Sequence, residues 1–198
     1  MDRLSARSKQ ALVLATGVIA ATLVLTPYAP AMDLPQHLAM AAELRRLWDG
    51  DPVTSADLTV NVATHNAGFH LFVAALAKVI PIELASRLFL ALCPTLLVIA
   101  IDRCLNELLL PRWRALLVIP IALGFTFCWG FVNFWMGTSL VWLAMALVFA
   151  QLRELKLWRA CALGVLGLAL SINHVLAMLG LAVVAAAAGL EHMAREFL

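Results

Sequence analysis

The sequence contains few charged residues, and this scarcity excludes a fold surrounded by water on all sides. Only 13% of its 198 residues are Asp, Glu, Lys or Arg, whereas about 25% are charged in an ordinary soluble domain. Hydrophobic residues make up 64% of the chain, so lipid must replace water as the solvent for much of its surface. The formal net charge of +2 and the lack of a basic stripe argue against a nucleic-acid partner.

Patterns typical of disulfides and metal centres are missing as well. The cysteines show no CxxC spacing and lie within or beside apolar runs, which is typical of small buried or lipid-facing side chains; they are Cys93, Cys104, Cys128 and Cys161. No HExxH motif occurs among the five histidines. We therefore predict no disulfide, no metal and no cofactor. A divalent metal held by some of the histidines stays an alternative without a supporting motif.

Long apolar segments predict an all-α, polytopic transmembrane bundle of six or seven spans. Crossing a bilayer core of about 30 Å takes roughly 17–20 helical residues, and most of the segments reach this length once their flanks are included. They occupy residues 11–26, 67–80, 84–101, 115–129, 134–150, 158–172 and 175–190. We expect the first segment to stay attached to the chain, and a cleaved signal peptide is the alternative. Residues 1–198 are expected to form one transmembrane domain.

The only long polar stretch is 27–65, which we interpret as a first periplasmic loop. Pro27 and Pro30 end the first span. Apolar side chains then recur on one face of 34–48, which predicts an amphipathic helix lying along the membrane surface. Trp48 at its end suits the headgroup level.

The distribution of Lys and Arg predicts the orientation. Basic residues cluster in 1–9, 102–114 and 151–159, with a weak fourth cluster at Arg195. All four lie on the cytoplasmic side if 67–80 does not cross. It would then be a re-entrant or interfacial helix, or half of a bent pair with 84–101. We favour this six-span arrangement, with a cytoplasmic amino terminus in a bacterial inner membrane. A seven-span arrangement, in which 67–80 crosses, stays open.

In the six-span arrangement the candidate functional residues collect on the outer face. Asp33 follows the first span closely and is interpreted either as the cap of the next helix or as a catalytic carboxylate. His37, four residues later, can project to the same side and form an acid–base pair with it. A histidine that faces lipid headgroups is the alternative for His37.

Further polar residues occur where apolar segments begin or meet. His65 and His70 flank the entry to 67–80, and His174 lies between the last two segments. An ionisable side chain at membrane depth is a functional candidate, although short turns also need polar residues. Asn133 lies in an aromatic segment bounded by glycines, which suits an interfacial belt or a platform that stacks on sugar or isoprenoid groups.

Glu83 and Arg87 are spaced i, i+4 on a predicted helix. Opposite charges at this spacing are neighbours on the helix surface. We predict that they form a structural ion pair.

Several of these features, taken in order, resemble the amino-terminal module of GT-C-type membrane glycosyltransferases and bacterial polytopic proteins of that build. After the basic start and first span they are DLPQHL at 33–38, ELASR at 83–87, WGFVNF at 129–134 with Gly137, and NH at 173–174. The resemblance covers nearly all of this chain but only the front part of such a protein. It implies that the chain is the amino-terminal part of a longer protein. Asp33 stands alone, whereas many members carry a second acidic residue beside the first.

The resemblance implies a transferase that moves a sugar from a polyprenyl-phosphate donor to an acceptor on the periplasmic face. Asp33 would be the general base. His37, His65, His70, Asn133 and His174 are the implied substrate-binding residues. Membrane lipid and the lipid-linked sugar are the implied partners, and no oligomeric state is predicted. The alternatives are a non-catalytic membrane subunit or scaffold, and part of a transporter.

Overall fold

The computed structural model describes residues 2–27, 29–61 and 64–197, with side chains for 7, 9–27, 29–61 and 64–194. Residues 28, 62 and 63 of the predicted outer loop lie outside this part, as do the side chains of Arg3 and Arg195 from the basic clusters. Every regular element among the described residues is helical, which confirms the all-α fold.

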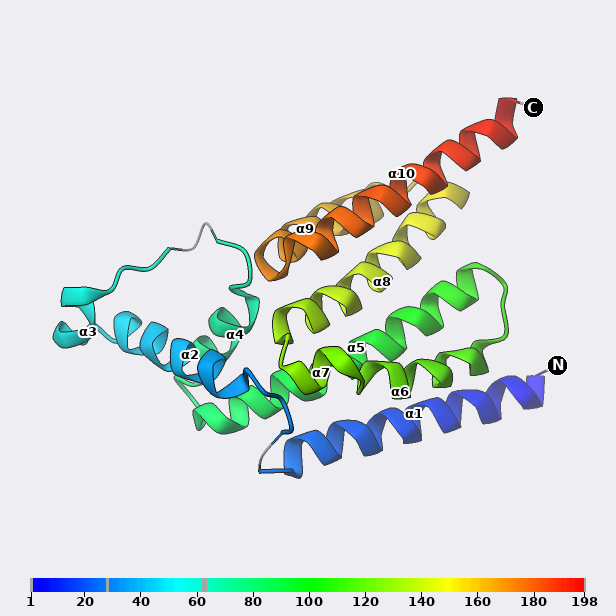
Figure 1. The fold of residues 1–198 in the computed structure, drawn as a ribbon. Helices are drawn as coiled ribbons and strands as arrows, with labels where there is room; N and C mark the ends of the chain where they lie inside the picture. Colours follow the sequence, from blue (N-terminus) through cyan, green and yellow to red (C-terminus); the bar gives the residue numbers. More distant parts are fainter. Residues whose placement is uncertain (1, 28, 62–63, 198) are drawn as a thin grey trace.

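The long helices run between two ends of the molecule (Figure 1). We call these ends the α2 end, which carries the short helices α2, α3 and α4, and the terminal end, near which both chain termini lie. The elements are α1 (Asp2–Leu25), α2 (Leu34–Trp48), α3 (Pro52–Asp57), α4 (Gly68–Leu76), α5 (Ile82–Glu107), η1 (Arg112–Leu117), α6 (Val118–Ala122), α7 (Phe125–Trp129), α8 (Val132–Arg153), α9 (Leu157–Asn173) and α10 (Val175–Phe197).

Four helical stretches among the described residues are long and apolar enough to cross a membrane. They are Ile82–Glu107, Arg112–Trp129, Val132–Arg153 and Val175–Ala194. The apolar helices Lys9–Leu25 and Leu157–Asn173 are shorter. Helix α4 has nine residues, a length of about 14 Å at 1.5 Å per residue, which is too short for a span. The chain therefore has the build of a polytopic membrane protein with four clear candidate spans.

The segment 115–129, predicted as one apolar helix, is broken into η1, α6 and α7. Pro120 lies within α6, where it has no backbone N–H to continue the helical hydrogen bonds. Gly124 separates α6 from α7 and is the N-cap of α7. The stretch remains apolar from end to end, so hydropathy alone does not reveal the break.

Helix α5 is the centre of the bundle, where it packs against both α1 and α8. The core contains large buried side chains from three helices: Phe69 of α4, Phe89 and Leu90 of α5, and Trp135 of α8. On α8, the Ser139 hydroxyl donates to the Cys93 carbonyl of α5 at 2.8 Å. This contact satisfies a hydroxyl that is buried between two apolar helices.

Arg87 does not make the ion pair predicted for it. Its guanidinium donates to the Val24 carbonyl at 3.1 Å and to the backbone carbonyl of Glu83 at 3.3 Å. The last carbonyls of a helix have no donor within that helix. Arg87 therefore ties the end of α1 to the start of α5 instead of pairing with the Glu83 carboxylate.

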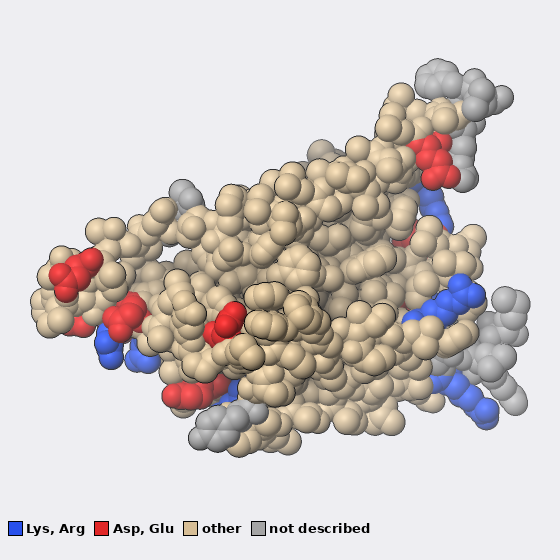
Figure 2. Space-filling model, viewed as in Figure 1, with Lys and Arg blue, Asp and Glu red and all other residues tan. Residues whose placement is uncertain are grey.

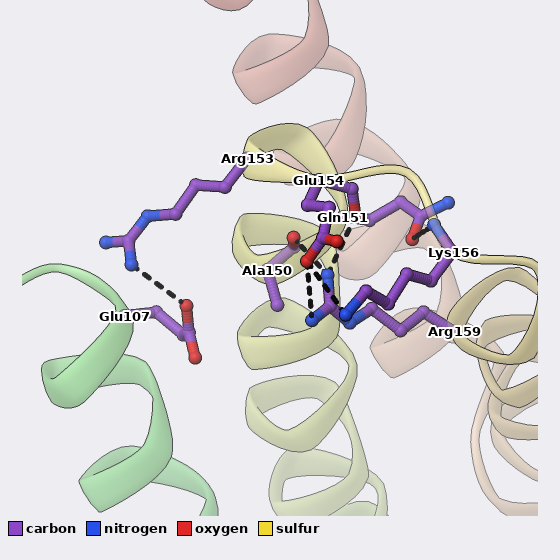
Figure 3. Close-up of polar contacts among 7 residues, drawn as sticks. All are labelled: Glu107, Ala150, Gln151, Arg153, Glu154, Lys156 and Arg159. Atoms are coloured by element: carbon purple, nitrogen blue, oxygen red, sulfur yellow. Dashed lines mark hydrogen bonds and ion pairs between the residues drawn. The ribbon is translucent and has the colours of Figure 1, made fainter.

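In Figure 2 the visible Lys and Arg side chains lie near the two ends, acidic side chains extend inward from the α2 end, and the face between these and the terminal end is uncharged. At the terminal end, α8 forms an ion pair with the end of α5, and the α8–α9 turn holds a second, separate group of ion pairs (Figure 3). Arg153 pairs with Glu107 at 3.2 Å, and Lys156 pairs with Glu154 at 2.9 Å. Arg112 likewise pairs with Asp102. The described basic residues of the second and third clusters thus lie at the same end.

Candidate functional site

A cavity of about 670 Å³ lies at the α2 end. Its wall is built by α2, α7, the start of α8 and the start of α10, which are far apart in the sequence. The predicted residues that line it are Asp33, His37, Asn133 and His174. Gln36, Phe131, Val132 and Phe134, which belong to the two motifs quoted at 33–38 and 129–134, also line it. Asn66, Phe125, Thr126 and Leu176 complete the wall.

Asp33 is held in the cavity wall through its backbone. The Met32 N–H donates to the Cys128 carbonyl at 2.9 Å, and the Asp33 N–H donates to the Trp129 carbonyl at 3.2 Å. Gly130 makes this approach possible, since it has a φ of +80° and a Cβ there would lie 2.7 Å from the Asp33 nitrogen. Gly130 is therefore required at the junction between α7 and Asp33.

The Asp33 carboxylate does not cap α2. Asp33 occupies the N-cap position, but its side chain accepts no hydrogen bond from the first turn. It is half-buried and lines the cavity. Its main-chain carbonyl instead accepts the His37 N–H at 3.1 Å. Among the described residues, the carboxylate is thus left available to a ligand.

His37 and His70 are in direct contact, with 3.0 Å between His37 Nδ1 and His70 Nε2. His37 lines the cavity, while His70 is buried behind it and does not belong to the cavity wall. Burial lowers the pKa of His70 to about 4, with repulsion from His37 as the smaller cause. Burial also lowers the pKa of His37, and the Asp33 carboxylate partly offsets this. Both rings are therefore neutral near pH 7.

Asn133 has a structural role that the sequence did not indicate. Its Oδ1 accepts the Phe69 N–H at 2.7 Å, and its Nδ2 donates to the Asn66 carbonyl at 2.7 Å. Phe69 lies in the first turn of α4, whose N-cap residue Ala67 offers no side-chain cap. Asn133, only 3% exposed, therefore caps α4 from another helix. Its side chain supports the wall and has both ends of its amide engaged.

His65 lies outside the cavity wall. Its Nδ1 donates to the Ser171 carbonyl at 2.7 Å, which ties the loop before α4 to α9. Close by, a Cβ on Gly68 would overlap the side chain of Asn173. These contacts fix the position of α4 against the end of α9.

His174 is the cavity residue contributed by the turn between α9 and α10. Its ring packs edge-on against Phe134, with 5.0 Å between ring centroids. Its Nδ1 is buried without a hydrogen-bond partner among the described residues. His174 and Asp33 share one cavity, as the six-span arrangement requires.

The arrangement offers a carboxylate and an imidazole to a ligand within an apolar, aromatic wall. Within the part of the chain that is described, no three His, Cys, Asp or Glu side chains lie close enough together to hold a metal ion. Comparison with protein-family models, curated proteins and solved structures finds no match to this chain.

Proposed function

We propose that the chain is part of a membrane-embedded glycosyltransferase of the GT-C type, which moves a sugar from a polyprenyl-phosphate donor to an acceptor. One observation carries the proposal: the Asp33 carboxylate has no hydrogen-bond partner among the described residues and lines a cavity of about 670 Å³. A scaffold has no need of such a cavity, and the convergence of Asp33, His37 and His174 on it argues against that alternative.

The cavity wall suits a ligand with both apolar and sugar parts. Phe125, Phe131 and Phe134 lie in the wall, and Trp129 stacks on Phe131 with 6.3 Å between ring centroids. Aromatic faces pack against isoprenoid chains and against the apolar faces of sugar rings. The polar groups are few and placed among these rings, as in most small-molecule sites.

The proposed reaction uses Asp33 as a general base. The carboxylate takes the proton of an acceptor hydroxyl while the hydroxyl oxygen attacks the anomeric carbon of the sugar. The bond between that carbon and the phosphate oxygen breaks, and polyprenyl phosphate leaves with the electron pair. A positioned base of this kind contributes roughly 10²–10⁴ in rate.

The proposal includes six spans in a bacterial inner membrane, with the terminal end in the cytoplasm. The two shorter helices, Lys9–Leu25 and Leu157–Asn173, would join the four longer stretches as spans. The gathering of basic clusters at the terminal end supports this orientation. Helix α2 would then lie along the periplasmic surface, with exposed Trp48 at headgroup level.

The test is a transfer assay on the full-length protein in proteoliposomes, with radiolabelled polyprenyl-phosphate sugars as donors. Asp33→Asn removes the base but keeps the shape of the side chain, so we expect a loss of about 100-fold or more in rate. Asp57→Asn is the matched control, because Asp57 is exposed at the end of α3. Equal rates for the wild type and Asp33→Asn would remove Asp33 from the mechanism.

A further inference from the structure

A groove of about 300 Å³ lies between α1 and α5 and shares no wall residue with the cavity that Asp33 lines. It runs along α1 from Leu12 to Ala20 and along α5 from Thr95 to Ile99. Its α1 positions recur every three or four residues, so they form one stripe on that helix. At Gly17 the groove is open, because a Cβ built on this glycine meets no atom within 4 Å. A narrow ligand therefore has room beside α1.

The surface of the groove is apolar. No charged residue belongs to its described wall. Its two threonines do not offer their hydroxyls, since Thr95 donates to the Ala91 carbonyl of its own helix at 2.7 Å and the Thr16 hydroxyl is buried. Such a wall suits a hydrocarbon chain, because each buried CH₂ group gains free energy there. A sugar would lose it, because its hydroxyls would lack hydrogen-bond partners.

The length of the groove matches one leaflet of a bilayer. Leu12 and Ala20 are eight residues apart, which is about 12 Å along a helix. One leaflet makes up about 15 Å of a hydrocarbon core that is roughly 30 Å thick. The groove begins about 5 Å from Lys9, where the apolar part of α1 starts at the terminal end. It is therefore placed to hold an acyl chain from the leaflet nearer the terminal end.

Two basic side chains lie beyond the terminal end of the groove. Lys9 precedes Leu12 and Val13 by one helical turn, and Arg103 follows Ile99 by one turn. Since α1 and α5 run in opposite directions (Figure 1), both turns lead towards the same end of the molecule. Both side chains are exposed, and neither forms an ion pair or a hydrogen bond with another described residue. Their charges are thus available to an anion.

The carboxylates of α5 near Arg103 are already engaged. Asp102 pairs with Arg112, and Glu107 pairs with Arg153 (Figure 3). Basic residues at the end of a pocket between transmembrane helices bind the headgroups of anionic lipids.

We propose that the groove binds one anionic phospholipid. An acyl chain lies between α1 and α5, and the headgroup phosphate lies at Lys9 and Arg103. The lipid packs against both helices at once and holds α1 to the bundle.

The headgroup is tested by native mass spectrometry of the full-length protein in detergent. The protein is titrated with dioleoyl phosphatidylglycerol or with dioleoyl phosphatidylcholine, which has the same acyl chains but no net charge. Each basic residue beside an anionic headgroup contributes about fivefold in affinity, so one phosphatidylglycerol should bind per chain, roughly 25-fold more tightly than phosphatidylcholine. Lys9→Gln with Arg103→Gln should abolish this preference. Arg45→Gln with Arg46→Gln, an equal change of charge at the α2 end, should keep it.

The acyl chain is tested by filling the groove. Gly17→Leu places a side chain in the open space and would displace at least two CH₂ groups of the lipid. Each buried CH₂ is worth about fourfold in affinity, so both lipids should bind about tenfold more weakly or worse. Gly164→Leu is the matched control, because this glycine of α9 also has open space around it but lies outside the groove. Inorganic phosphate should not displace the lipid.

Four results would overturn the proposal. Equal affinity of the wild type for the two lipids does so, whether or not any variant folds. Undiminished binding by Gly17→Leu would place the lipid elsewhere. Displacement by inorganic phosphate would indicate a headgroup site without the groove, and a lipid-free dimer would indicate that a second copy of the chain fills it. Lipid binding needs no turnover, so failure of the transfer assay would leave this site standing, and the reverse also holds.

Discussion

Single polar side chains at the α2 end divide into two groups. Asn133 and His65 hold the fold, since each uses its hydrogen-bonding groups on the backbone of a distant element. The Asp33 carboxylate and the Nε2 of His37 have no hydrogen-bond partner within the described part of the chain. The sequence shows the residue types but not the partner atoms, so it could not separate these groups. Substitutions of Asn133 or His65 should therefore lower the free energy of unfolding, whereas substitutions of Asp33 or His37 should weaken ligand binding.

Loss of the Asn133 side chain should destabilise the protein. Asn133→Ala removes one buried and one partly buried hydrogen bond and leaves the Phe69 N–H without a partner. We expect a loss of about 2–4 kcal/mol in the free energy of unfolding. Denaturant or thermal unfolding in detergent measures it. Asn106→Ala is the control, because Asn106 is exposed near the end of α5. A change for Asn133→Ala no larger than that of the control would contradict the capping role.

Stability should fall as the pH drops below about 6.5. The pKa of His70 is about 4 in the folded protein and 6.5 ordinarily, so between these values the unfolded chain binds a proton that the folded chain does not. The contribution is fully present above pH 6.5 and is lost progressively towards pH 4, by at most about 3 kcal/mol. Carboxylates also titrate in this range, so the measured quantity is the difference between the wild type and His70→Phe. Parallel pH profiles for the two proteins would contradict the burial of a neutral His70.

The sequence predicted most accurately the helices whose apolar and polar residues alternate with helical spacing within a single segment. Residues 34–48 form a helix with the predicted bounds, because a repeating apolar face is visible in one segment. The break in 115–129 occurs at Pro120 and Gly124, and α4 is only nine residues long. A hydropathy average over these segments shows neither feature. Six or seven spans were predicted, but only four helical stretches among the described residues are long and apolar enough to cross a membrane. Two further apolar helices, Lys9–Leu25 and Leu157–Asn173, are shorter.

The junction between α7 and α2 depends on Gly130. Gly130→Ala would force a side chain into left-handed backbone and against the Asp33 nitrogen, which costs about 2 kcal/mol or more. Gly164→Ala is the matched control, since that glycine lies within α9 with open space around it. There alanine should raise stability slightly, by about 0.5–1 kcal/mol. Equal effects at both positions in thermal unfolding would show that α7 does not hold Asp33.

For the molecule as a whole, counting charges predicted that the polar candidates share one end and the basic clusters the other. The described residues of these groups are arranged in this way. Arg45, Arg46 and Lys78 are exceptions, since they form ion pairs at the α2 end. The distribution of charges did not predict the contact between His37 and His70. These residues are 33 positions apart in the sequence and belong to different helices. The common placement of Asp33, His37 and His174 is the central claim, because a shared site requires it.

Sided cysteine labelling tests this claim most directly. Gln36→Cys and His174→Cys place thiols in the cavity wall, and Arg153→Cys places one at the terminal end. Each is made with exposed Cys128 and Cys161 replaced by alanine, and is treated with a membrane-impermeant maleimide in right-side-out and inverted vesicles. We expect positions 36 and 174 to react from the periplasmic face and position 153 from the cytoplasmic face. Labelling of 36 and 174 from opposite faces would contradict a shared site.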